Sequence, residues 1–132
     1  MQRWETHVDI RSLWKATELE IAKPIVGTEY ESLKLYIIET YVRVVPEKVH
    51  ELSKSIVAER MSTELQRLQV DNCLVKVCFI LEECAFELMW NDLLGIIDDV
   101  WQRHSEFWIV SSRSDWLIDI DHENLITIVR RR

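Results

Sequence analysis

The chain has 132 residues, of which 48% are hydrophobic and 30% are charged. This length and composition predict one folded domain over residues 1–132 and argue against a disordered chain. Only two glycines and two prolines are present, which nearly excludes linkers and glycine-rich phosphate loops. No stretch approaches 18 consecutive apolar residues and the first residues lack a secretory pattern, so we expect no membrane span and a cytoplasmic location.

The three cysteines, Cys73, Cys78 and Cys84, all lie in apolar segments. An odd number of cysteines is not typical of the disulfide frameworks of secreted domains. Their spacings, C-x4-C and C-x5-C, also differ from the close C-x2-C pairs of zinc sites. We therefore predict buried free thiols in a reducing compartment, with no bound metal or other cofactor.

The net charge of −7 is unevenly distributed along the chain. Residues 1–69 carry ten Lys or Arg and eleven Asp or Glu, whereas residues 70–129 carry three and twelve, a net charge of −9. Because phosphate binding needs a cationic surface, this distribution argues against nucleic-acid binding, although three arginines follow at 130–132. An acidic half favours a basic protein partner, and plain solubility is the alternative explanation.

The chain begins with a predicted helix. Asp9 is a suitable N-cap, and apolar residues recur at helical spacing from Ile10 to Ile21. Pro24 and Gly27 are expected to end this helix.

The next segment is ambiguous. Thr28 and Glu31 have capping-box spacing, which predicts a short helical turn. Residues 36–45 are rich in β-branched and aromatic side chains that alternate with more polar ones, which favours a strand. The alternative is a helix, in which Glu39 and Arg43 would pair at i,i+4 spacing.

A long helix is predicted over about residues 46–68. Pro46 suits a first helical position, and a sustained apolar stripe runs from Val49 to Leu68.

A β-hairpin is predicted next, because apolar residues alternate over 75–81 and again over 84–90. Glu82 and Glu83 would form its polar tip. A continuous helix is the alternative, since no glycine marks the turn.

The last part of the chain is predicted to contain one helix and three strands. Asn91 is a suitable N-cap for a helix that extends to His104, and strands are expected over 107–111, 116–121 and 125–129. The complete pattern predicts an α+β fold: an antiparallel sheet of five or six strands with three main helices packed on one face.

One polar cluster, formed by Asp115, Asp119, Asp121, His122 and Glu123, has the side chains that a divalent metal requires. A solvated strand face followed by a turn explains it more simply, with His122 hydrogen-bonded in the turn. We therefore predict no metal site.

Other catalytic arrangements have little support in the sequence. The adjacent pairs 82–83 and 98–99 are acidic, but neighbouring side chains point in different directions and do not form a dyad. Cys84 could act as a nucleophile with His104 or His122 only if the fold brought them together. No G-x-S-x-G, G-x-x-x-x-G-K-[ST] or H-E-x-x-H motif occurs, and we predict that the protein is not an enzyme.

Six tryptophans are many for this length. Trp14, Trp90, Trp101 and Trp116 lie on faces that are predicted to be buried. Trp108 lies on the same predicted strand face as Glu106 and Val110, so it could be a partly exposed anchor at an interface, although the core is the more frequent location.

The C-terminal part of the chain carries a strand pattern marked by tryptophan and histidine. The pattern is Glu106-Phe107-Trp108-Ile109-Val110-Ser111, then Trp116-Leu117-Ile118, His122 and Leu125-Ile126. Over roughly residues 75–129 it resembles small bacterial immunity proteins, of the SUKH type or of contact-dependent growth inhibition systems, which neutralise protein toxins. This chain has Glu123 where that pattern has a second histidine. The resemblance implies a toxin-binding protein.

Three hypotheses follow. The first is an immunity protein that neutralises a basic toxin domain, possibly a nuclease, through an acidic surface; its expected contact residues are Asp98, Asp99, Asp115, Asp119, Asp121 and Glu123. The second is a small metal-dependent hydrolase that uses His122 with nearby carboxylates. The third is an oligomeric structural module with the helix at 46–68 as its interface. The acidic half and the resemblance favour the first.

Overall fold

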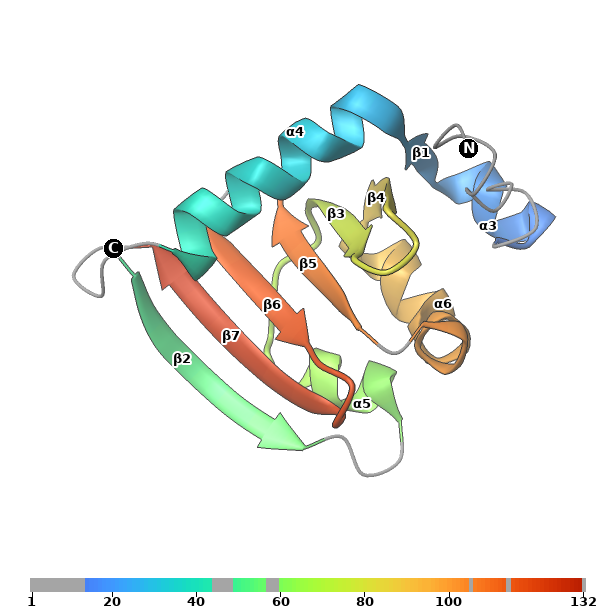
Figure 1. The fold of residues 1–132 in the computed structure, drawn as a ribbon. Coiled ribbons are helices and arrows are strands. Elements are labelled where there is room, and N and C mark those ends of the chain that lie inside the picture. Colours follow the sequence, from blue (N-terminus) through green and yellow to red (C-terminus); the bar gives the residue numbers. More distant parts are fainter. Residues whose placement is uncertain (1–13, 44–48, 57–59, 105, 114, 132) are drawn as a thin grey trace.

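The computed structural model describes residues 14–43, 49–56, 60–104, 106–113 and 115–131. Its seven strands form one antiparallel sheet in the order β1-β4-β3-β5-β6-β7-β2 (Figure 1). The strands are β1 (Lys23–Ile25), β2 (Val49–Ile56), β3 (Leu74–Phe79), β4 (Cys84–Met89), β5 (Phe107–Ser111), β6 (Trp116–Ile120) and β7 (Leu125–Arg131). The helices are α3 (Ala16–Ile21), α4 (Gly27–Ile37) with a π-helical continuation η1 (Ile38–Val42), α5 (Met61–Gln66) and α6 (Trp90–Arg103). The predicted α+β class with an antiparallel sheet is confirmed.

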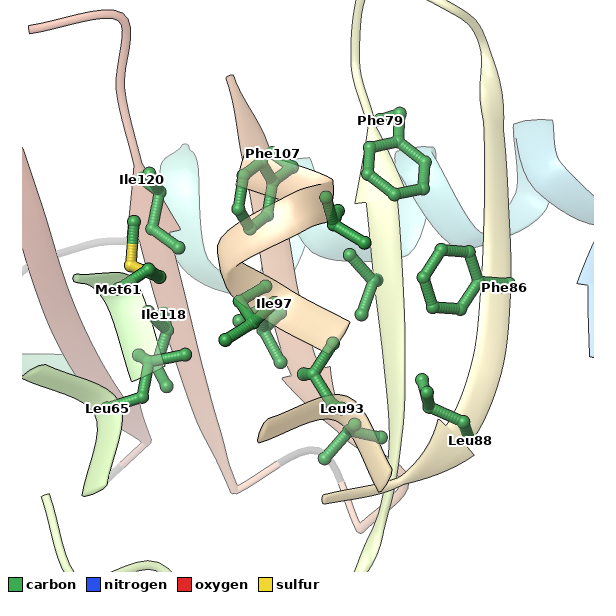
Figure 2. Packing of buried hydrophobic residues seen from close by; sticks show 14 of the residues in the cluster. Met61, Leu65, Phe79, Phe86, Leu88, Leu93, Ile97, Phe107, Ile118 and Ile120 are labelled. Atoms are coloured by element: carbon green, nitrogen blue, oxygen red, sulfur yellow. The ribbon is translucent and has the colours of Figure 1, made fainter. Parts of the chain in front are cut away.

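One face of the sheet carries the larger core, beneath α5 and α6. In Figure 2, Leu93 and Ile97 of α6 lie over the middle of the sheet, and Met61 and Leu65 of α5 lie beside Ile118 and Ile120. The sheet contributes alternate residues of β3, β4, β5, β6 and β7 to this core, as expected when successive strand side chains point to opposite faces.

The other face of the sheet is covered by α4 and η1. Their buried residues Tyr30, Ile37 and Tyr41 pack against the second set of alternate strand residues, which includes Val110 and Leu117. The Tyr30 hydroxyl also donates a hydrogen bond to the Phe79 carbonyl (3.5 Å). The expectation that all main helices lie on one face is therefore corrected, because the central strands are apolar on both faces and both need cover.

The prediction of a strand over residues 36–45 is wrong where the structure describes this segment, because residues 36–42 belong to the end of α4 and to η1. Ile37 and Tyr41 are both buried and lie four residues apart, a helical spacing that serves the second core. Burial of this face outweighs the β propensity of the individual residues. Residues 44–45 lie outside the described residues.

The long helix predicted over 46–68 is also wrong. Within its described part the chain forms the edge strand β2 and, after a gap, the short helix α5. A β-bulge between Glu51 and Ser53 interrupts the pairing of β2 with β7. Because a bulge breaks the alternation that marks a strand, the sequence shows no period of two here.

The hairpin and the three C-terminal strands are confirmed, as β3–β4 and β5–β6–β7. The β3–β4 turn needs no glycine because Glu83 itself adopts a left-handed conformation (φ 55°). The predicted helix after Asn91 is confirmed as α6, although Met89 is its N-cap. Of the helix predicted over 10–21, residues 16–21 form α3, whereas Trp14 and Lys15 precede it without helical structure and residues 10–13 lie outside the described residues. Among the described helices, none is long and apolar enough to cross a membrane.

Candidate functional site

Four carboxylates gather near the β6–β7 turn: Glu106, Asp119, Asp121 and Glu123, which we call the acidic turn cluster. Asp119 lies on β6 directly opposite Trp108 of β5, and Glu106 comes two residues before that tryptophan. Asp121 and Glu123 belong to the turn that follows β6. Alternation along paired strands therefore brings Glu106, Trp108 and Asp119 to one face of the sheet.

Asp121 shapes the turn itself. Its Oδ1 accepts hydrogen bonds from the backbone N–H groups of Glu123 (2.8 Å) and Leu125 (3.1 Å). Asn124 takes the left-handed conformation that the turn requires (φ 64°), which asparagine tolerates better than most residues. Asp121 therefore stabilises the local structure and also contributes charge to the cluster.

His122 connects the turn to the segment before β5. Its Nδ1 lies 2.8 Å from Oε1 of Glu106, and its Nε2 lies 4.0 Å from the Glu123 carboxylate. The expectation that His122 makes a hydrogen bond is thus met by the Glu106 side chain.

Burial and like charges perturb Asp119. Its half-buried position raises the pKa of this carboxyl, and the neighbouring Asp121 and Glu106 raise the pKa further; a hydrogen bond from Trp108 opposes the shift. The ion pairs of the described lysines and arginines are made with other acids: Glu18, Glu64, Glu87, Asp98 and Asp99. No described lysine or arginine is therefore paired with the cluster, and the basic side chain beside it is His122.

Asp98 was predicted to contact a partner, but its carboxylate makes hydrogen bonds with other residues of this chain. Its carboxylate accepts hydrogen bonds from the Ser62 backbone N–H (3.0 Å) and hydroxyl (2.6 Å) at the start of α5. The Arg60 guanidinium donates to it from 3.1 and 3.3 Å. Although partial burial alone would raise it, these contacts together lower the pKa of Asp98.

Asp99 and Asp115 lie away from the acidic turn cluster. Asp99 is exposed on α6 and forms an ion pair with Lys15, which lowers the pKa of Asp99. Asp115 lies at the other end of β6 from Asp121, where its Oδ1 accepts a hydrogen bond from the Ser111 hydroxyl (2.5 Å). The fold therefore brings together Asp119, Asp121 and Glu123, but not the other three predicted contact residues.

Glu82 and Glu83 lie in the β3–β4 turn, as predicted, and Glu82 also makes a contact inside the fold. Oε1 of Glu82 lies 2.9 Å from Nδ1 of the buried His104, whose ring stacks on Phe79 with centroids 4.1 Å apart. Although burial alone would raise it, the hydrogen bond and charge of His104 lower the pKa of Glu82. The sequence analysis missed this pair because its members lie 22 residues apart and meet only after β3, β4 and α6 have assembled.

The cysteines are free thiols. Burial raises the pKa of both Cys78 and Cys84 to about 12. Cys84 is also close enough to Glu82 for that charge to raise its pKa further. A thiol with such a pKa stays protonated near neutral pH, so the structure gives no support to Cys84 as a nucleophile.

Metal binding has no geometric support in the part of the chain that the structure describes, because no group of three His, Cys, Asp or Glu side chains is placed to hold an ion. The sequence analysis also missed Glu106 as a member of the acidic turn cluster. The pairing of two consecutive strands, which sets Trp108 opposite Asp119, is the signal that could have indicated it.

In comparisons with known proteins, no family model, curated protein or solved structure matches the chain.

Proposed function

We propose that this protein is a cytoplasmic immunity protein, which neutralises a basic toxin domain by binding it through the acidic turn cluster. The observation that carries the proposal is the gathering of Glu106, Asp119, Asp121 and Glu123 at one end of β6, where no described lysine or arginine is paired with them. Burial first, and then the charges of Asp121 and Glu106, raise the pKa of Asp119, so ionisation of this carboxyl opposes folding. A cationic partner would relieve this repulsion and gain affinity and association rate from it.

Trp108 supports this choice of surface. Its indole is half-buried between the acidic turn cluster and the core beneath α4, where it contacts the buried cluster that contains Val110 and Leu117. Aromatic side chains held in this way are frequent anchors of protein interfaces, and surrounding charges commonly set the specificity. A toxin domain that binds a polyanionic nucleic acid would offer the complementary basic surface.

The other hypotheses receive less support from the described residues. The oligomeric module depended on a long helix over 46–68, and β2 and α5 stand there instead. The hydrolase depended on His122 with carboxylates at a metal, and among the described residues no group of three His, Cys, Asp or Glu side chains is placed to hold one.

The test uses the tagged protein as bait in the organism that encodes it. The binding variant combines Glu106→Gln, Asp119→Asn and Glu123→Gln, and it leaves Asp121 in place because Asp121 holds the turn. The control removes three exposed charges on the N-terminal half, with Glu20→Gln, Glu29→Gln and Glu39→Gln.

We expect the wild type and the control to capture one basic protein, and the binding variant to capture much less of it at moderate salt. Expressed alone, the captured domain should arrest growth, and co-expression of the wild type should restore growth. Equal capture by the binding variant, or a captured protein without toxicity, would refute the proposal.

A further inference from the structure

An open pocket of about 620 Å³ lies at the end of β6 that is opposite the acidic turn cluster. Its walls come from the segment 68–74, the β5–β6 turn and the adjoining ends of β6 and β7. This volume lies within the range of small-molecule sites in proteins, roughly 300–1,000 Å³.

The pocket has an aromatic wall that is fixed in place. Trp116 is half-buried, and its ring meets the buried Trp90 edge to face, with centroids 5.8 Å apart and an interplanar angle of 81°. Leu68, Val70 and Ile118 extend this wall with apolar surface. A planar apolar group could therefore lie against Trp116 without reorganising the side chains around it.

Two arginines line the same pocket. Arg130 of β7 lies directly opposite Trp116 of β6, and Arg113 belongs to the β5–β6 turn. The other described cations of residues 70–131 are engaged by the fold: Lys76 with Glu87, Arg103 with Glu18, and Arg131 with Tyr36. The side chains of Arg113 and Arg130 make no hydrogen bond or ion pair with another described residue.

Asp71 and Asp115 also line the pocket, but among the described residues neither forms an ion pair with these arginines. Asp115 is part of the pocket, and its Oδ1 accepts a hydrogen bond from the Ser111 hydroxyl. The backbone carbonyl of Asp115 also accepts a hydrogen bond from the Arg131 N–H (3.0 Å), which fixes the end of β7. Asp71 is exposed in the segment 68–74. In a half of the chain that is strongly acidic, the two uncommitted arginines converge on one pocket with an aromatic wall.

We propose that this pocket binds a small organic anion, in which a planar ring lies against Trp116 and a carboxylate or phosphate ester is bound by Arg113 and Arg130. The inference is independent of the proposed toxin binding. Guanidinium groups suit both oxyanions, because their planar N–H donors form paired, charge-assisted hydrogen bonds with them.

The test follows the indole N–H resonances of the ¹⁵N-labelled protein while probes are added. The probes are benzoate, phenyl phosphate, inorganic phosphate and benzyl alcohol, so that ring and charge are varied separately. Trp116→Phe assigns the reporting resonance, and the buried Trp14 serves as an internal reference.

We expect saturable shifts of the Trp116 resonance with benzoate or phenyl phosphate, the stronger response identifying the oxyanion, and much weaker responses with the other two probes. The double variant Arg113→Gln/Arg130→Gln should weaken this binding by about tenfold or more, the range for loss of charge-assisted hydrogen bonds. The control Lys23→Gln/Arg43→Gln, which removes two exposed cations elsewhere, should bind as the wild type does.

Three results would overturn the proposal. They are no saturable shift with either aromatic anion, unchanged binding by the double variant, and equal binding of benzyl alcohol. Far-UV circular dichroism of the double variant checks that it remains folded, which is expected because both arginines are exposed.

Discussion

Replacement of Asp98 by alanine should separate a structural role from a partner-binding role. The carboxylate joins α6 to the first turn of α5 through the Ser62 backbone N–H and hydroxyl and through Arg60. Loss of a capping bond to a helix N-terminus costs about 1 kcal/mol. Loss of the short bond from the hydroxyl costs about 1–1.5 kcal/mol, and the exposed Arg60 pair adds less than about 0.5 kcal/mol after screening. We therefore expect Asp98→Ala to lower the free energy of unfolding by about 2–3 kcal/mol.

The assay is urea denaturation followed by tryptophan fluorescence, with Asp99→Ala as the matched control. Asp99 is the exposed neighbour on the same helix and should leave the unfolding midpoint nearly unchanged. The folded state lowers the pKa of Asp98 below its ordinary value of 3.8. The contribution of the ionised carboxylate to the free energy of unfolding is therefore complete above the pKa of the unfolded state. The difference in free energy of unfolding between the wild type and Asp98→Ala should shrink as the pH falls through the pKa that Asp98 has in the folded state. Equal stability of the two variants at pH 7 would refute the structural role.

Three further predictions concern the core, a backbone conformation and the acidic turn cluster. Ile97→Ala should lower the free energy of unfolding by about 2–5 kcal/mol in the same denaturation assay, because Ile97 is fully buried between α6 and the sheet. Gln69→Gly should raise the thermal midpoint of unfolding, because Gln69 has φ 54° and glycine relieves a backbone strain of about 1 kcal/mol. The control Gln102→Gly, within α6, should lower the midpoint, and a lower midpoint in both variants would contradict this account. Asp119→Asn should stabilise the protein at pH 7. The pKa of Asp119 is higher in the folded than in the unfolded state, so the wild type loses stability as the pH rises from the unfolded-state pKa through the folded-state pKa. A pH series of melting curves checks this, and no gain at pH 7 would count against charge repulsion at Asp119.

The elements that could be predicted from the sequence are those whose pattern is local. Strands β3 to β7 alternate over five to seven residues and are joined by short polar turns, except where α6 intervenes with its own amphipathic pattern. The failures are elements that depend on distant partners. β2 is stabilised as a strand by pairing with β7, whose residues follow their partners by 69 to 82 positions in the chain, and the bulge in β2 removes the sequence signal. β1, only three residues long, likewise exists through its pairing with β4.

The candidate site divides in the same way. Asp119, Asp121 and Glu123 are near one another in sequence, and the strand and turn keep them together in space. Asp98 was assigned to the surface because nothing in its local sequence indicates Arg60 and Ser62, which precede it by 38 and 36 residues. The convergence of Arg113 and Arg130 likewise depends on the register of β6 with β7.

The fold pairs some charged side chains of the acidic half with one another and leaves others without an ion pair. Both proposals concern the side chains that are left without one. Several acids and bases on or beside helices are paired, as in Arg103 with the buried Glu18 (2.6 Å). The acidic turn cluster has no ion pair with a described lysine or arginine, and the two pocket arginines have none with a described carboxylate; the two groups lie at opposite ends of β6. Exposed charges separated by more than about 10 Å are largely screened at 0.1 M salt, and a five-residue strand spans about 17 Å. Neutralising one group should therefore leave ligand binding at the other nearly unchanged, so that protein binding at the turn and anion binding at the pocket can be tested separately.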